Sequence, residues 1–242
     1  MSPSPKRADY GLDAPGLVRG FALGGAAAAL AGAVLKLLVP TLGFANALVS
    51  IGASFFLTAM LMLLSSRVGK LRARDRLLDT LGLAPTDVVL DVGCGRGLLL
   101  VGAAKRLPDG IAIGIDLWQA ADLSANSKAA ALANAAVEGV AARVEVRDGD
   151  MRELPFADAT FDAVVACFSI HNVPDRAGRE KAVREIYRVL KPGGSVALFD
   201  FAKTGEYAAT LASAGACDVR RTLPWLYTFP PGRAVSATKP SA

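Results

Sequence analysis

Two long apolar stretches dominate the first third of the chain. Residues 17–39 carry one basic residue near each end, and residues 44–64 carry no charge at all. Each stretch, at ~1.5 Å per helical residue, is long enough to cross a ~30 Å hydrocarbon layer. A short turn, residues 40–43, joins them. The pattern predicts a transmembrane helical hairpin within residues 16–66.

Two alternatives to a membrane hairpin are a signal peptide and a buried soluble hairpin. The first stretch is too long for a signal-peptide core, and a second span follows directly. Soluble helices seldom lack a polar face. Gly20, Gly24, Ala28 and Gly32 recur every fourth residue, so they are expected to form the contact face of the first helix. The polar residues 1–15 are predicted to be a disordered tail.

Basic residues flank the hairpin on both sides. Lys6, Arg7 and Arg19 precede or open the first stretch, five basic residues follow the second within 67–76, and the connecting turn is uncharged. The positive-inside rule then predicts a multi-pass protein of the cell membrane with both termini in the cytoplasm. The basic run is also expected to lie against anionic headgroups.

From residue 67 to residue 242 the pattern changes to short apolar runs that alternate with amphipathic segments. This alternation predicts βαβ units and a doubly wound, mostly parallel α/β sheet of seven strands. The last two strands have no helix between them and are expected to pair antiparallel. Strands are predicted near 88–92, 111–116, 143–147, 161–167, 195–201, 218–223 and 234–239. Helices are predicted near 71–81, 98–107, 124–137, 176–190 and 207–214.

Composition narrows the function classes. The chain has 242 residues, 52% of them hydrophobic, which suits a domain with a membrane segment. The net charge of +5 comes largely from the hairpin flanks, so it argues little for nucleic acid. Three scattered cysteines indicate no disulfide framework, and a single histidine excludes a histidine-cluster metal site.

The strand predicted at residues 88–92 ends in a glycine-rich turn. Gly93, Gly95 and Gly97 alternate there, and a helix follows, so the loop lies at a helix N-terminus that favours anionic or polar ligand groups. A dinucleotide fingerprint needs G-x-G-x-x-G, which this spacing does not match. A Rossmann-type oxidoreductase is therefore a disfavoured alternative.

The ends of the next strands also carry polar groups. In a doubly wound sheet the ligand lies at the carboxyl ends of the strands. Asp116 ends the second strand, where a carboxylate can accept from two ribose hydroxyls, and Leu117 can cover an adenine ring. Asp150 follows the third strand and can accept from an adenine amino group, while the N–H of Met151 can reach a ring nitrogen.

Several motifs resemble the class I S-adenosylmethionine-dependent methyltransferases. Asp91 and the three glycines form the D-x-G-x-G-x-G motif, residues 150–162 are similar to D-x-x-x-L-P-F-x-D-x-x-F-D, and residues 190–194 to L-K-P-G-G. The resemblance covers residues 87–200. It implies that the loop with Gly93, Cys94, Gly95 and Gly97 packs against the methionine part of the cofactor, while Asp91 helps to hold its amino group.

The resemblance also places the loop after the fourth strand, from Cys167 onward, at the transferred methyl group. Cys167 is accordingly a candidate cofactor contact, and His171 is a candidate general base. His171 can equally serve only to shape the pocket, because many methyl transfers need no more than in-line approach and desolvation.

These observations predict a membrane-anchored methyltransferase that transfers a methyl group from S-adenosyl-L-methionine to a small, apolar or lipid-like acceptor. A membrane protein that binds the cofactor without catalysis is an alternative. The aromatic stretch 224–230 is expected either near the acceptor entrance or as a cap on the sheet. The acceptor itself and the oligomeric state are not encoded in any motif.

Overall fold

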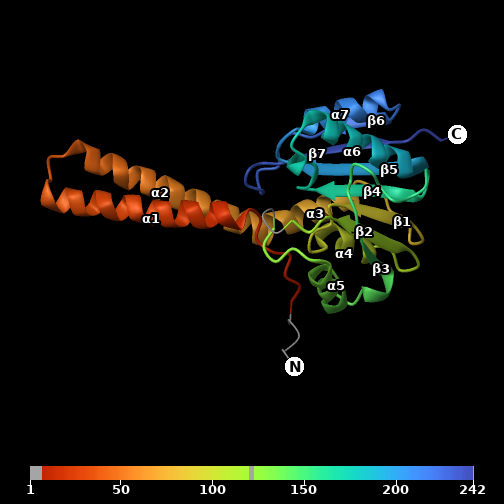
Figure 1. Cartoon of the computed structure of the whole chain (residues 1–242), viewed down its shortest axis with the longest axis horizontal. Coiled ribbons are helices and arrows are strands. Elements are labelled where there is room, and N and C mark those ends of the chain that lie inside the picture. Colours follow the sequence, from red (N-terminus) through yellow and green to blue (C-terminus); the bar gives the residue numbers. More distant parts are fainter. Residues whose placement is uncertain (1–6, 120–122, 242) are drawn as a thin grey trace.

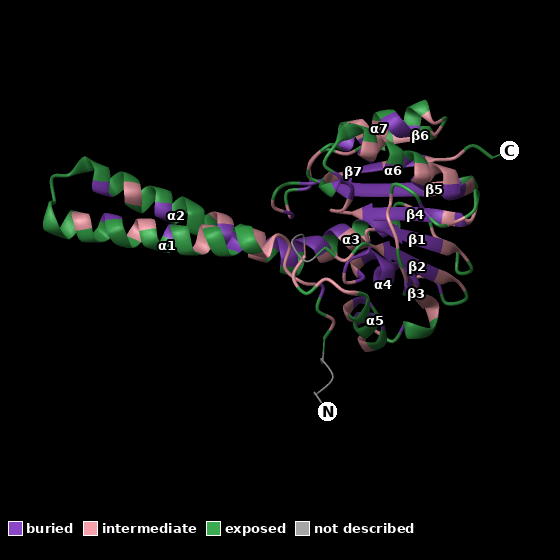
Figure 2. Ribbon diagram, viewed as in Figure 1, coloured by how far each residue is buried: buried purple, intermediate pink, exposed green. Residues whose placement is uncertain are grey.

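The computed structural model describes residues 7–119 and 123–241. A helical hairpin projects from one side of an α/β domain (Figure 1). Helix α1 (Pro15–Leu38) leads away from the domain, and α2 (Gly43–Leu64) returns to it. Figure 2 shows that most of the hairpin surface is exposed, whereas the central strands of the domain are buried.

The contact face of the hairpin differs from the predicted one. The buried residues recur every seventh position: Val18, Gly25 and Gly32 in α1, and Ala45, Gly52 and Ala59 in α2. A Cβ on Gly25 would lie 2.9 Å from the Gly52 carbonyl oxygen, but one on Gly20 would meet nothing within 4 Å. A seven-residue repeat spans two helical turns and keeps one seam on a nearly antiparallel partner. The four-residue stripe drifts off that seam.

Helix α2 continues into the domain without a loop. A π-helical turn (Ser65–Gly69) joins it to α3 (Lys70–Asp79). The Ser65 hydroxyl accepts a hydrogen bond of 2.8 Å from the Phe229 amide. Of the basic run, Arg67 and Arg72 are exposed, whereas Lys70 is only 3% exposed. Lys70 therefore serves the domain, and only the exposed arginines are available to headgroups.

The sheet has seven strands in the order β3-β2-β1-β4-β5-β7-β6. The first five pair in parallel, and β7 is antiparallel to both β5 and β6. The predicted α/β class and strand topology are confirmed. The strand bounds are β1 Val88–Val92, β2 Ile111–Asp116, β3 Val144–Asp148, β4 Phe161–Cys167, β5 Leu190–Asp200, β6 Cys217–Arg221 and β7 Arg233–Thr238.

Helices cover both faces of the sheet and bury two apolar clusters. One contains Leu77 of α3, Leu99 of α4 (Leu98–Ala104) and Ala131 of α5 (Lys128–Val137). The other contains Ile186 of α6 (Arg176–Val189) and Leu211 of α7 (Thr204–Ser213). Strands β2 and β3 lie on one side of β1, and β4 and β5 lie on the other. The strand order therefore reverses at β1, and a crevice opens at the carboxyl ends of β1, β2 and β4.

The segment before α1 lies on the domain instead of forming the predicted disordered tail. Residues 1–6 of that prediction fall outside the described residues. Asp9 hydrogen-bonds to Asn134, and Leu12 to Ser124, both across the mouth of the crevice. The prediction is therefore wrong for residues 8–13, because partners distant in sequence fix a segment that is polar by composition.

Candidate functional site

One cavity of about 960 Å³ joins the carboxyl ends of the strands to the base of the hairpin. It is lined by ten of the eleven residues that the sequence selects: Asp91, Gly93, Cys94, Gly95, Asp116, Leu117, Asp150, Met151, Cys167 and His171. Gly97 is not part of the lining. It begins α4 with φ 84°, a backbone conformation that a side chain would strain.

The glycine loop is held over the end of β2. The amides of Gly93 and Cys94 donate to the Ile115 carbonyl at 2.8 and 3.1 Å. Gly93 has φ 71°, and a Cβ there would lie 2.3 Å from the Cβ of Ser169. Glycine is thus required at this position, and the loop backbone can lie directly against a ligand.

Asp91 is a buried carboxylate beside this loop. Asp91 is only 2% exposed, and one oxygen of its carboxylate accepts a 2.8 Å hydrogen bond from the Leu100 amide. Burial, together with the negative charge of Asp116, raises the pKa of Asp91 to about 8. A cation bound next to Asp91 would favour its ionised form, which suits a ligand with an ammonium group.

Asp116 lies at the end of β2 with hydrogen-bonding capacity to spare. Its carboxylate accepts from the amides of Gly95 at 2.8 Å and Trp118 at 2.6 Å. A carboxylate has about four acceptor sites, so it can also accept from a ligand diol. Asn126 donates to the same carboxylate at 3.4 Å, and its buried Oδ1 has no hydrogen-bond partner among the described residues. This unsatisfied acceptor fits a ribose hydroxyl.

Asp150 marks the far end of the cofactor side. Bidentate hydrogen bonds from Arg152, together with its positive charge, hold the pKa of Asp150 below its ordinary value. The carboxylate therefore stays ionised and can accept from a ligand amino group. Trp118 is not part of the cavity lining, and its indole N–H donates to Asp148 at 2.6 Å.

His171 is positioned by a group that the sequence analysis missed. Its Nδ1 lies 2.9 Å from Oδ1 of Asp200, the last residue of β5. Asp200 is 1% exposed and also accepts from the Tyr207 hydroxyl at 3.1 Å. A carboxylate at a strand end is the same signal that identified Asp91 and Asp116, so Asp200 could have been found. The nearby thiol of Cys167 has its pKa raised by burial and is a neutral lining group.

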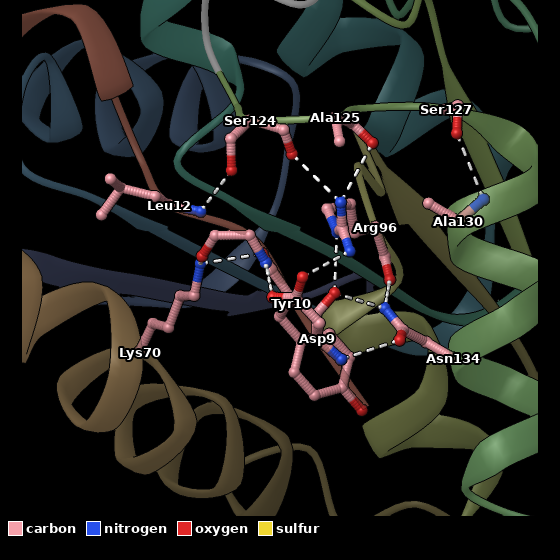
Figure 3. A network of polar contacts seen from close by, with 11 residues as sticks. Asp9, Tyr10, Leu12, Lys70, Arg96, Ser124, Ala125, Ser127, Ala130 and Asn134 are labelled. Carbon is pink, nitrogen blue, oxygen red and sulfur yellow. Dashed lines mark hydrogen bonds and ion pairs between the residues drawn. The ribbon is translucent and has the colours of Figure 1, made fainter. Parts of the chain in front are cut away.

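A second missed element is the segment of residues 8–13, which we call the strap (Figure 3). Arg96 of the glycine loop donates to the Asp9 carbonyl at 2.7 Å and to its carboxylate at 2.8 Å. Asn134 of α5 donates to the same carbonyl at 2.9 Å. The strap therefore crosses the cavity mouth and is tied to the loop that would hold the cofactor.

Lys70 fixes the other end of the strap. Its ammonium group donates to the carbonyls of Tyr10 at 2.9 Å and Gly11 at 2.7 Å, and it pairs with Asp13 at 3.3 Å. All three donors of the buried lysine are satisfied in this way. No local pattern predicts the arrangement, because the partners are about 60 residues apart.

Comparison with known proteins places the domain in a family. Residues 90–198 match the family model described as a methyltransferase domain. This part of the chain is therefore similar to methyltransferase domains of this family. It is 34% identical over 130 residues to the demethylmenaquinone methyltransferase of Lactobacillus johnsonii, covering 52% of this chain and 49% of that protein.

A ubiquinone/menaquinone biosynthesis C-methyltransferase of Geotalea daltonii is 35% identical over 120 residues, with 49% of this chain and 47% of that protein covered. The chain thus spans about half the length of the curated relatives it matches. Neither match covers the whole chain.

Solved structures confirm the fold of the methyltransferase domain. A S-adenosylmethionine-dependent methyltransferase from Aquifex aeolicus superimposes with a TM-score of 0.57 at 22% identity, over 75% of this chain and 97% of that one. The cyclase SpnF gives a TM-score of 0.58 at 21% identity, over 71% and 82%. The expected resemblance to class I methyltransferases is therefore correct.

Proposed function

We propose that the protein is a membrane-anchored methyltransferase that uses S-adenosyl-L-methionine and acts on a small, apolar or lipid-like acceptor. One observation carries the proposal: the glycine loop of a methyltransferase domain and three carboxylates from separate strand ends, Asp91, Asp116 and Asp150, line a single cavity. The curated relatives named above act on quinone precursors by their names, which supports a quinone-type acceptor.

The residues present fit this cofactor. Asp91 is suited to the ammonium group, Asp116 with Asn126 to the ribose hydroxyls, and Asp150 to the adenine amino group. The bound cofactor supplies an electrophilic methyl group on a sulfonium. The loop backbone and the strap exclude water around it, which favours in-line transfer to a nucleophile that is held in place.

We propose that His171 takes up a proton from the molecule that receives the methyl group. If its Nδ1–H donates to Asp200, its Nε2 is left as the acceptor site, and the carboxylate stabilises the imidazolium that forms. The alternative role is to shape the pocket with Phe201, whose ring centroid lies 4.5 Å away. A His171→Gln variant separates the two roles: loss of a base changes the pH profile of kcat, whereas a changed shape alters KM.

Membrane anchoring by two spans, with both ends and the domain in the cytoplasm, is the second part of the proposal. Both helices are long and apolar enough to cross a membrane. A core helix of a soluble protein would be mostly buried, but Leu23, Leu30 and Leu37 of α1 are 67–83% exposed. The exposed Arg19 and Arg67 lie at the domain end of the hairpin, as the positive-inside rule requires.

Cofactor binding tests the proposal. Calorimetry on the full-length protein in detergent is expected to show binding of S-adenosylmethionine and none of NAD. Asp116→Ala should weaken binding by ~1.5–3 kcal/mol, the range for a hydrogen bond to a charged group. Asp109→Ala, at an exposed position outside the cavity, is the matched control and should bind normally. Binding of NAD without S-adenosylmethionine would contradict the assignment.

A further inference from the structure

The cavity has an arm that a cofactor on the glycine loop does not account for. The arm enters the base of the hairpin, and we call it the hairpin arm. The helices line it with Gly16, Leu17 and Phe21 of α1 and Thr58 and Met62 of α2, and the loop before β7 adds Phe229. Thr58 is the one polar side chain among these, and its hydroxyl donates to the Ser54 carbonyl of its own helix at 2.9 Å. Where the arm meets the domain, Ser65 and the Asp13–Lys70 pair also line the cavity.

The hairpin arm is continuous with the proposed reaction centre. The same cavity is lined by His171, Phe168 and Phe201, which lie where the transferred methyl group is expected. The rings of Phe168 and Phe201 are 6.0 Å apart. The cavity thus runs from the histidine to the hairpin, and on the way it passes the Asp13–Lys70 pair.

The arm reaches the level of the bilayer. From Pro15 to Phe21 is about 9 Å along the helix axis, at ~1.5 Å per residue. Helix α1 has 24 residues, so it is about 36 Å long and exceeds a ~30 Å hydrocarbon layer by about 6 Å. Phe21 then lies at the edge of the hydrocarbon, and the exposed Arg19 lies at the headgroups.

We infer that the hairpin arm binds the hydrocarbon chain of an amphiphilic acceptor and admits that acceptor from the bilayer, with the reacting head beside His171. The inference rests on the proposed function and adds the binding site of the chain. The cavity volume of about 960 Å³ is at the top of the ~300–1,000 Å³ range for ligand pockets, and its lining extends beyond the glycine loop to the base of the hairpin.

Two glycines one helical turn apart supply a matched pair of variants. A Cβ on Gly16 or on Gly20 meets nothing within 4 Å, and both residues are exposed. Only Gly16 lines the cavity. Gly16→Trp therefore adds a large side chain at the cavity lining, while Gly20→Trp adds the same side chain one turn further along α1, outside the lining. Met62→Trp inside the arm and Met60→Trp outside it form a second pair.

The test uses the full-length protein in phosphatidylcholine vesicles with a hydroquinone that carries a long alkyl chain bearing a diazirine. Illumination should label the lining residues Leu17, Phe21 and Met62. Gly16→Trp and Met62→Trp should lower this labelling by about tenfold, because displacing two methylene groups from an apolar site costs that much affinity. Gly20→Trp and Met60→Trp should label like the natural sequence.

Binding of S-adenosylmethionine, measured on the same samples, serves as the folding check for each variant. If one inside variant fails this check, the other pair decides. Equal labelling of the inside and outside variants would overturn the hairpin arm as the chain site, and so would labelling confined to residues outside it. Labelling does not require the cofactor, so a failure of cofactor binding in the natural sequence would contradict the proposed function separately.

Discussion

The hairpin and the methyltransferase domain are both rich in apolar residues, but they place them on opposite sides. In the domain the large side chains, such as Leu90, Leu198 and Ile186, are fully buried. In the hairpin the buried seam is made of glycine, alanine and one valine, while leucines and phenylalanines face outward. In water, the hydrophobic effect favours burial of large apolar side chains. In apolar surroundings that effect is absent, and helices associate through close packing of small residues. This contrast is what the proposed placement of the hairpin in a bilayer predicts.

Charged residues on the outer face of the hairpin should have the largest effect of the changes that test this contrast. Leu30 and Phe56 are 67% and 53% exposed, near the middle of their helices. Replacing both with Asp should cost about 5–7 kcal/mol of membrane insertion, at ~2.5–3.5 kcal/mol each. The fraction that resists an alkaline carbonate wash should fall sharply.

Leu132→Asp is the control for that experiment. Leu132 is 40% exposed on α5 of the domain, where water is the expected surroundings. This variant should stay in the membrane fraction. Release of the natural full-length protein by the wash would contradict the two spans.

Truncating one leucine in each region sharpens the same contrast. Leu198→Ala removes a fully buried side chain of β5 and should lower the free energy of unfolding of the domain by ~2–5 kcal/mol. Leu37→Ala, at a position 83% exposed on α1, should leave that free energy unchanged. Denaturant titration in mild detergent, followed by tryptophan fluorescence, measures both; similar losses would show that the hairpin packs as a soluble core.

The smallest expected effect is the pH dependence of cofactor affinity at Asp91, whose carboxylate would face the charged ammonium group of the cofactor. The Asp91 pKa of about 8 lies above its ordinary value, so the empty domain holds a proton there and loses stability as pH rises toward 8. The ammonium group of the cofactor needs the ionised carboxylate. Affinity should therefore rise with pH between about 6 and 7.5, by up to about tenfold per unit. Calorimetry should show a flat profile for Asp91→Asn, and a flat profile for the natural sequence would contradict the role.

The sequence was informative wherever a function depends on a strand end. Asp116 and Asp150 are predicted because parallel strands bring their carboxyl ends together. Asp91 is predicted from the glycine motif that resembles class I methyltransferases, and all three line one cavity. The glycine spacing likewise separated the domain from dinucleotide-binding folds. These signals are local in the sequence and can be recognised without knowing how the domain packs.

The parts that sequence did not predict depend on distant contacts. The strap is polar and short, and it is held by side chains far away in the sequence, among them Lys70, Arg96 and Asn134. The hairpin seam uses Gly25 and, of the predicted stripe, Gly32, because the crossing geometry selects the face. The aromatic stretch divides between both expected roles: Trp225 stacks on Phe199 of the sheet, whereas Phe229 lines the cavity.

The most direct test of a methyltransferase that works at the membrane is to follow a labelled methyl group. Full-length protein in vesicles made from lipids of its own membrane would be supplied with methyl-labelled S-adenosylmethionine, with Asp116→Ala as the inactive control. We expect the labelled methyl group in the organic phase of a lipid extract for the natural sequence, and much less of it for Asp116→Ala. Label found only in water-soluble products, at the same rate for the natural sequence and for the variant with Asp at Leu30 and Phe56, would contradict it.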